Sequence, residues 1–503
     1  MDYQKKLTEL KALLAEVNDL NNAAAVLSWD QSTYMPAGGA PARGRQMATL
    51  ARVAQEKFID KKVGKLLEQL VKYEESLPFD SDDASLIRVA RRDYERALKI
   101  PPDFLEKFNV HSAETYQVWT EARPANDFAR VRPNLEKTLD FSRQLADFFP
   151  GYEHIADPLI DFADYGMKAS SVRALFAELR ENLVPIVKAI TSLPPADDSC
   201  LRKHFPEDRQ LMFGAETVKQ MGFDFERGRL DKTPHPFTTS FSIGDVRITT
   251  RVRENFLGEL LFSNIHEAGH GMYEQGCDPA FEGTLLAGGT SSGVHESQSR
   301  LWENVVGRSR GFWEYFLPKA QAVFPEQLKG VSLDEFYRAV NKVEKSLIRT
   351  DADEVTYNLH VMLRFDFELQ MLEGTLSIRD LPEAWHERFE HDFDVVPPDD
   401  RDGVLQDVHW YGGIIGGSFQ GYTLGNVMGA LFYAEALKAH PGIPGEMKQG
   451  KFNTLHDWLI QNIYRYGRKY TAPELVKKVT GGDLTIQPYI NYLKTKYGEL
   501  YTL

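Results

Sequence analysis

The chain has 503 residues, and 59 Lys and Arg against 73 Asp and Glu give it a formal net charge of −14. Its 42% hydrophobic and 12% aromatic content is too high for a disordered protein. The acidic balance argues against a surface that neutralises nucleic-acid phosphates or anionic lipid, and two cysteines exclude a disulfide framework or a four-thiolate zinc site.

The N-terminus lacks the apolar core of a signal peptide, and no run approaches 18 consecutive apolar residues. We therefore expect a cytoplasmic protein without a membrane or nucleic-acid partner. No low-complexity linker or repeat period divides the chain. The sequence is consistent with one catalytic domain over residues 1–503.

Most of the sequence has the apolar spacing of helices, beginning with residues 3–27. Further helices are predicted around residues 43–74, 84–99, 101–119, 132–149 and 170–192. Residues 236–252 differ, because Thr, Val, Ile and Phe dominate and Gly244-Asp245 marks a turn, which predicts a β-hairpin. Helices resume at residue 253, and a loop-rich zone covers about 395–425. The predicted fold is mainly α with one small sheet.

The segment that carries chemistry follows the hairpin and contains the pattern H-E-x-x-H at residues 266–270. Four residues turn a helix by 400°, so His266 and His270 project from one face within reach of one ion. Glu267 can reach a water on that ion, as the general base of a zinc peptidase does. The alternative is a buried helix with two incidental histidines and an exposed glutamate.

A catalytic zinc needs a third protein ligand and an open position. The best candidates are His295 and Glu296, which follow a glycine-rich break and a serine that can cap a new helix. Adjacent helical residues diverge by 100°, so one of the two would face the metal. Geometry alone does not choose between His295 and Glu296. It also leaves open that this segment is an ordinary helix start with polar residues.

Several motifs together resemble the carboxypeptidase Taq family of zinc metallocarboxypeptidases. In chain order they are S-W-D-Q-S-T-Y-M-P (28–36), D-V-R-I-T (245–249), H-E-A-G-H (266–270), H-E-S-Q-S-R (295–300), I-R-T-D-A-D-E (348–354) and G-V-L-Q-D-V-H-W (403–410). The resemblance implies His266, His270 and Glu296 as zinc ligands and Glu267 as base. It also implies a two-lobed helical body with a deep groove, of the neurolysin and angiotensin-converting-enzyme type, and a homodimer. N-terminal helices of about 1–75 could form a lid over the groove.

A carboxypeptidase must bind a free terminal carboxylate, which the planar fork of arginine pairs with best. Arg349 lies in the stretch that resembles the substrate-binding motif of the family, so we assign it this role; its alternative is an ion pair with Asp351 or Asp353. Arg247 is a second candidate, although it could pair with Asp245 and be structural.

A tetrahedral oxyanion needs a hydrogen-bond donor beside the metal. His409 and Tyr422, both in the loop-rich zone, are the candidates; their alternatives are a satisfied core histidine and a packed tyrosine. After His-Trp, this zone lacks the Gly-Tyr-Phe-Pro-type run that is usual in the family. The assignment of Tyr422 depends most on this difference. The glycines of this zone do not make a phosphate cradle, because no G-K-[ST] follows.

The predicted function is release of single amino acids from the C-terminus of peptides with broad specificity, by metal-activated water. Zn²⁺ is the expected ion, and Co²⁺ or Mn²⁺ fit the same ligands. Alternatives are a zinc oligopeptidase or dipeptidyl carboxypeptidase of the same type, a metal-dependent hydrolase of non-peptide substrates, and an inactive helical peptide-binding scaffold.

Overall fold

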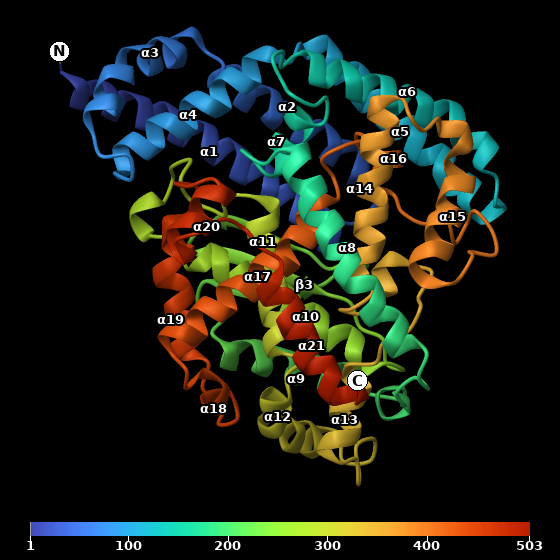
Figure 1. Cartoon of the computed structure of the whole chain (residues 1–503). Helices are drawn as coiled ribbons and strands as arrows, with labels where there is room; N and C mark the ends of the chain where they lie inside the picture. The colour runs from blue at the N-terminus through green and yellow to red at the C-terminus, as the bar shows by residue number, and fades with distance from the viewer. Residues whose placement is uncertain (1, 503) are drawn as a thin grey trace.

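The computed structural model describes residues 2–502, and its fold is helical apart from one three-stranded sheet (Figure 1). The sequence-based prediction of a mainly α fold with one small sheet is therefore confirmed. Among residues 2–502, no helix combines the length and apolar character needed to cross a membrane.

The N-terminal helices form a group with its own small core. They are α1 Tyr3–Thr33, α2 Ala40–Phe58, α3 Lys61–Ser76 and α4 Asp82–Lys99. Leu10, Leu70 and Ile87 meet in this core, and Phe281 and Leu286 join it from the body of the protein. The single helix predicted over 43–74 is wrong: the chain breaks before Lys61, because Asp60 accepts a hydrogen bond from the Lys62 N–H and caps a new helix.

The remaining helices enclose one large hydrophobic core. They are α5 Pro102–Ala125, α6 Phe128–Asp147, α7 Asp157–Ala163, α8 Ala169–Thr191, α9 Glu207–Met221, α10 Leu257–Gln275, α11 Ser292–Arg300, α12 Arg310–Val323, α13 Leu333–Val340, α14 Tyr357–Glu373, α15 Leu381–Phe393, α16 His409–Gly412, α17 Gln420–Ala439, α18 Ile443–Met447, α19 Asn453–Asn462, α20 Ala472–Thr480 and α21 Gln487–Tyr501. The zone predicted as loop thus contains α16 and the start of α17. The helices from α5 to α21 thus share one core, next to the smaller core of the N-terminal helices.

The sheet consists of β1 Gly228–Lys232, β2 Thr238–Ser242 and β3 Asp245–Thr250, in the order β1-β3-β2. The predicted hairpin is the antiparallel pair β2–β3, with Gly244 in its turn. The parallel partner β1 was not predicted, because Arg229, Asp231 and Lys232 give it no apolar strand pattern. The sheet packs against α10, so it borders the helix that carries H-E-x-x-H.

Three helices meet at the centre of the molecule, where α11 lies between α10 and α17 (Figure 1). Glycines allow the close approach. A Cβ on Gly269 of α10 would lie 2.6 Å from the Ser299 Cα, and one on Gly425 of α17 would lie 2.5 Å from the Glu296 Cγ. The backbone of α11 can therefore approach both neighbours only where they lack a side chain.

Gly425→Ala tests this packing. The added methyl group has no room beside Glu296, so we expect the free energy of unfolding to fall by about 1–3 kcal/mol in urea titrations. The matched control is Gly498→Ala in α21, where nothing lies within 4 Å of the new Cβ and alanine should stabilise the helix by up to about 1 kcal/mol. Equal effects of the two changes would contradict the packing argument.

Candidate metal centre

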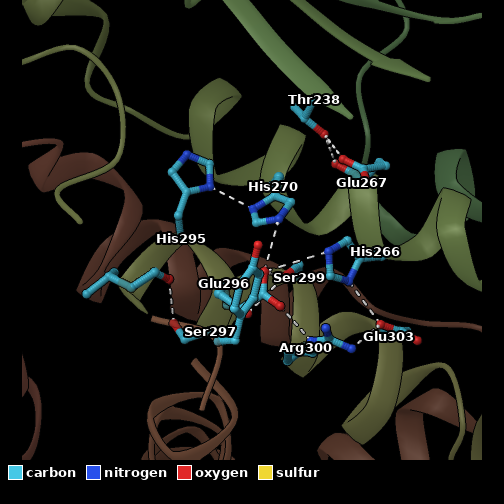
Figure 2. Close-up of polar contacts among 12 residues, drawn as sticks. Thr238, His266, Glu267, His270, His295, Glu296, Ser297, Ser299, Arg300 and Glu303 are labelled. Atoms are coloured by element: carbon cyan, nitrogen blue, oxygen red, sulfur yellow. Dashed lines mark hydrogen bonds and ion pairs between the residues drawn. The ribbon is translucent and has the colours of Figure 1, made fainter. Parts of the chain in front are cut away.

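Three side chains converge between α10 and α11 (Figure 2). His266 and His270 lie one turn apart on α10, and their Nε2 atoms are 3.7 and 3.4 Å from the Glu296 Oε2 atom. Their three ligand atoms lie within 4.8 Å of one another, and the described residues contain one such group. The helical spacing of the histidines brings them to one face, and the packing of α11 brings the carboxylate to them.

The far ring nitrogen of each histidine has its own partner. His266 Nδ1 lies 2.9 Å from a carboxylate oxygen of Glu303, and His270 Nδ1 lies 2.7 Å from His295 Nδ1. His295 in turn places its Nε2 2.6 Å from Glu274. These contacts are satisfied when His266 and His270 each carry the proton on Nδ1, which leaves both Nε2 lone pairs directed at Glu296. Carboxylate partners of this kind orient metal-binding histidines.

Glu296 is buried and bound on both oxygens. Arg300 donates to Oε1 over 2.7 Å, and Ser299 donates to Oε2 over 3.1 Å. Burial alone would raise the pKa of Glu296, but Arg300, His266 and His270 together hold it well below its ordinary value. The carboxyl is therefore ionised, as a metal ligand must be.

The set fits a divalent ion. Tetrahedral ligands of zinc lie roughly 3.3–3.6 Å apart, close to the separations observed here. Burial lowers the pKa of His270 to about 4, so its ring is neutral near pH 7 and Nε2 is free to bind a cation. His266, His270 and Glu296 would hold the ion. His295, the other candidate ligand, contacts His270 and Glu274 instead.

Glu267 lies on α10 beside this group and faces the sheet. The Thr238 hydroxyl on β2 donates to its Oε2 over 2.6 Å (Figure 2). Burial raises the pKa of the Glu267 carboxyl, against the lowering effect of His266. Its second oxygen makes no hydrogen bond to the residues described, so it can accept a proton.

A second cluster surrounds Asp407. Arg349, at the start of the short turn η5 (Arg349–Asp351), donates from Nε and NH2 to this carboxylate, and Arg364 of α14 lies 3.0 Å from it. The pairing of Arg349 with Asp351 or Asp353 that the sequence left open does not occur. Arg349 is 6% exposed, so its charge is fixed in a nearly dry setting.

His409 and Tyr422 belong to the same cluster. His409 Nδ1 contacts Asp407 over 2.5 Å, and its Nε2 lies 3.2 Å from the Tyr422 hydroxyl. Tyr357 joins this cluster to the metal ligands: its hydroxyl accepts from Arg349 over 2.9 Å, and its ring lies 4.4 Å below the Arg300 guanidinium. The structure thus brings Arg349, His409 and Tyr422 together beside the candidate metal centre.

Arg247 stands apart from these groups. Its guanidinium makes two hydrogen bonds to Asp245, of 2.9 and 2.8 Å, and lies between the rings of Trp29 and Phe241. No hydrogen bond or ion pair joins it to either cluster within residues 2–502. Arg247 therefore pairs with Asp245, which is the structural alternative that the sequence left open.

Sequence reasoning missed Glu303, Thr238 and Asp407. Glu303 follows Glu296 by seven residues, two helical turns, and this spacing was a usable signal even though residues 301–306 form a π-helical turn. Asp407 lies inside the motif G-V-L-Q-D-V-H-W (403–410), two residues before His409. Thr238 carried no local signal, because its contact with Glu267 depends on how the sheet packs.

Comparison with known proteins identifies the family. Residues 9–497 match the family described as carboxypeptidase Taq (M32) metallopeptidase. Thermostable carboxypeptidase 1 of Thermus thermophilus is 40% identical to this chain, over 96% of each protein. Carboxypeptidase 1 of Bacillus subtilis is 34% identical, over 100% of this chain and 99% of the relative.

Solved structures agree. The crystal structure of an M32 carboxypeptidase from Deinococcus radiodurans R1 is 49% identical, covers 99% of this chain and 100% of its own, and superposes with a TM-score of 0.96. Matches of this extent cover the candidate metal centre and the helices around it. The chain belongs to the carboxypeptidase Taq (M32) family of metallopeptidases and is a metal-dependent carboxypeptidase.

Proposed function

We propose that this carboxypeptidase removes single residues from the free C-terminus of peptides at the site formed by the two clusters. The observation that carries the proposal is their junction at Tyr357, which contacts Arg300 beside the metal ligands and Arg349 in the second cluster. The scissile carbonyl belongs to the penultimate residue and the free carboxylate to the last residue, so the groups that bind them must lie close together.

We assign the metal to His266, His270 and Glu296. A divalent ion there supplies Lewis acidity, which polarises the carbonyl and lowers the pKa of water. We propose Zn²⁺ because the donor set is two imidazoles and one carboxylate, and Co²⁺ or Mn²⁺ would be accepted by the same ligands.

Glu267 is the proposed general base. Its free carboxylate oxygen would take a proton from the attacking water and pass it to the leaving amine, while the Thr238 hydroxyl holds the other oxygen in place. Tyr422 and His409 are the proposed donors to the oxyanion. Their mutual hydrogen bond is consistent with one of them donating and the other orienting it.

Arg349 is the proposed partner of the substrate carboxylate. Three of its five N–H groups are used by Asp407 and Tyr357, so two remain to form a fork toward a ligand. Asp407 holds both Arg349 and His409, and we assign it a positioning role. Arg247 would stabilise the contact between the sheet and α1.

A lid formed by N-terminal helices is also proposed, and their separate small core supports it. The groove, broad specificity, the homodimer and a cytoplasmic location stay predictions of the sequence. The alternatives of the same zinc type, an oligopeptidase and a dipeptidyl carboxypeptidase, would cut at other bonds, so a direct assay of products distinguishes them.

Glu267→Gln tests the base. We expect unchanged metal content and a loss of turnover of about 10²–10⁴-fold, because glutamine cannot accept the proton. The measurement is mass spectrometry of a peptide digest, in which the wild-type enzyme should produce a ladder of single-residue losses from the C-terminus that a chelator abolishes. Glu259→Gln on the same helix, where Glu259 pairs with Arg251, is the control and should keep activity. Near-normal turnover of Glu267→Gln would exclude the assignment, and loss of residues in pairs would favour a dipeptidyl carboxypeptidase.

Arg349→Lys tests carboxylate recognition. Lysine keeps the charge but loses the planar fork, so we expect kcat/KM for free-acid peptides to fall by about 10–100-fold. Matched peptides with an amidated C-terminus should be poor substrates of both enzymes. If Arg247→Lys, and not Arg349→Lys, reduces the preference for the free acid, Arg247 is the binding residue.

Asp407→Asn tests the buried ion cluster. It leaves Arg349 and Arg364 without a counter-ion, so we expect a loss of about 3–5 kcal/mol in unfolding free energy near pH 7. Burial would raise the pKa of Asp407, but Arg364, His409 and Arg349 hold it far below its ordinary value. A lowered pKa stabilises the fold above the unfolded value of about 3.9 and this contribution declines at lower pH, so the difference between wild type and variant should shrink below about pH 4. The exposed pair partner Asp245→Asn should cost less than about 1 kcal/mol at any pH.

A further inference from the structure

A basic cavity of about 400 Å³ lies away from the two clusters, between α4 and the segment 149–168 of the body. Six cationic side chains line it, five from one helix and one from the opposite wall: Arg88, Arg91, Arg92, Arg96, Lys99 and Lys168. The run of basic residues on α4 is visible in the sequence, and the fold places residues 149–168 opposite it. Arg96 crosses to that wall, where it donates to the Asp161 carbonyl over 2.8 Å.

Three of these cations have no carboxylate partner. Arg88 donates to the Phe79 and Lys469 carbonyls and to the Ser85 hydroxyl, and Arg96 donates to a carbonyl only. Lys99 is in no ion pair in the described part of the chain. Burial lowers the pKa of both Arg88 and Arg96, which is the mark of a desolvated positive charge without full compensation.

The acidic residues of the cavity wall compensate these charges only in part. Asp157 accepts from the backbone N–H groups of His154 and Ala169 and lies 3.7 Å from Lys168. Asp161 accepts from the Gly166 N–H. Glu95, the third acid, is exposed. The carboxylates of Asp157 and Asp161 thus hold the loop and the start of α8. Arg91 pairs with Glu74 and Arg92 with Asp93, whereas no carboxylate accepts from Arg88 or Arg96.

Aromatic rings fix the orientation of the cations. The guanidinium of Arg92 lies 4.5 Å above the Tyr165 ring, that of Arg96 lies 4.8 Å above Phe162, and the Lys99 ammonium lies 5.4 Å above Phe149. A guanidinium stacked by its face presents its N–H edge, the geometry that pairs with two oxygens of one anion.

We propose that this cavity is a binding site for a phosphate-type oxyanion, either free phosphate or the phosphoryl group of a small molecule. Three cations of α4 without a carboxylate partner, with Lys168 on the facing wall, match a ligand with several negative oxygens, whereas a monovalent ion would leave most of them unpaired. The volume exceeds that of phosphate alone and lies within the range of small-ligand pockets. A bound anion would connect α4 to the body through Lys168.

The test is isothermal titration calorimetry of the whole protein with inorganic phosphate, phenyl phosphate and chloride, without any peptide. We expect saturable binding of phosphate or phenyl phosphate and none of chloride. Arg96→Gln should weaken it by about tenfold or more. Lys99→Gln, at an exposed position that should not disturb folding, should weaken it in the same direction. Arg52→Gln on α2, which removes the same charge at an exposed i,i+4 pair, is the matched control.

The relative affinities of the two phosphates distinguish the two kinds of ligand. Equal affinity for the two phosphates identifies free phosphate as a sufficient ligand, and tighter binding of phenyl phosphate identifies a phosphorylated molecule that also uses the rings. Absence of saturable binding, binding of chloride with equal affinity, or an equal loss in Arg52→Gln would overturn the proposal. None of these residues contacts the metal ligands or Arg349, so the result of the peptide ladder assay does not depend on whether the cavity binds phosphate. Saturating phosphate should also raise the unfolding temperature of the wild type.

Discussion

The site depends on the close backbone approach of α11 to α10 and α17. Gly269 lies between His266 and His270 in sequence, and it allows α11 to come near enough for Glu296 to reach both rings. Gly425 removes the obstacle on the other side. Because the histidines are fixed by their own helix, the position of α11 alone decides whether three ligands converge or two ligands face an unmatched carboxylate.

That approach concentrates charge in the interior, and the structure compensates it residue by residue. Glu296 and Glu303 are both buried, and Arg300 contacts both, while Arg308 adds a second cation at Glu303. A buried carboxylate without such partners would take up a proton and lose its use as a ligand or an orienting group. Tyr357 connects this group to Arg349, because its ring packs against Arg300 and its hydroxyl accepts a hydrogen bond from Arg349.

Features set by neighbouring residues in one helix could be predicted from the sequence, whereas contacts between distant segments could not. The placement of His266 and His270 on one face could be predicted, because their spacing is a property of one helix. Asp407 lies 58 residues from Arg349, and no spacing rule connects them. Strand β1 is charged and pairs through a parallel connection, which gives no hairpin signal. Gly421, Gly425 and Gly429 recur every fourth residue, but in a zone rich in glycine this reads as loop until α11 is seen packed on it.

Comparison of the two candidate arginines shows what substrate recognition requires of the fold. Both are paired with an aspartate, but Arg349 is buried against Asp407, whereas Asp245 beside Arg247 is 40% exposed. A pair with one partner this exposed contributes less, because solvent screens the charge of Asp245. Arg349 is nearly desolvated on folding and its orientation is set by three hydrogen bonds, so a terminal carboxylate bound there, as proposed, would meet a preorganised partner. A peptide without that carboxylate would leave the remaining N–H groups unpaired in a dry setting, so rejection follows from the same burial that gives affinity.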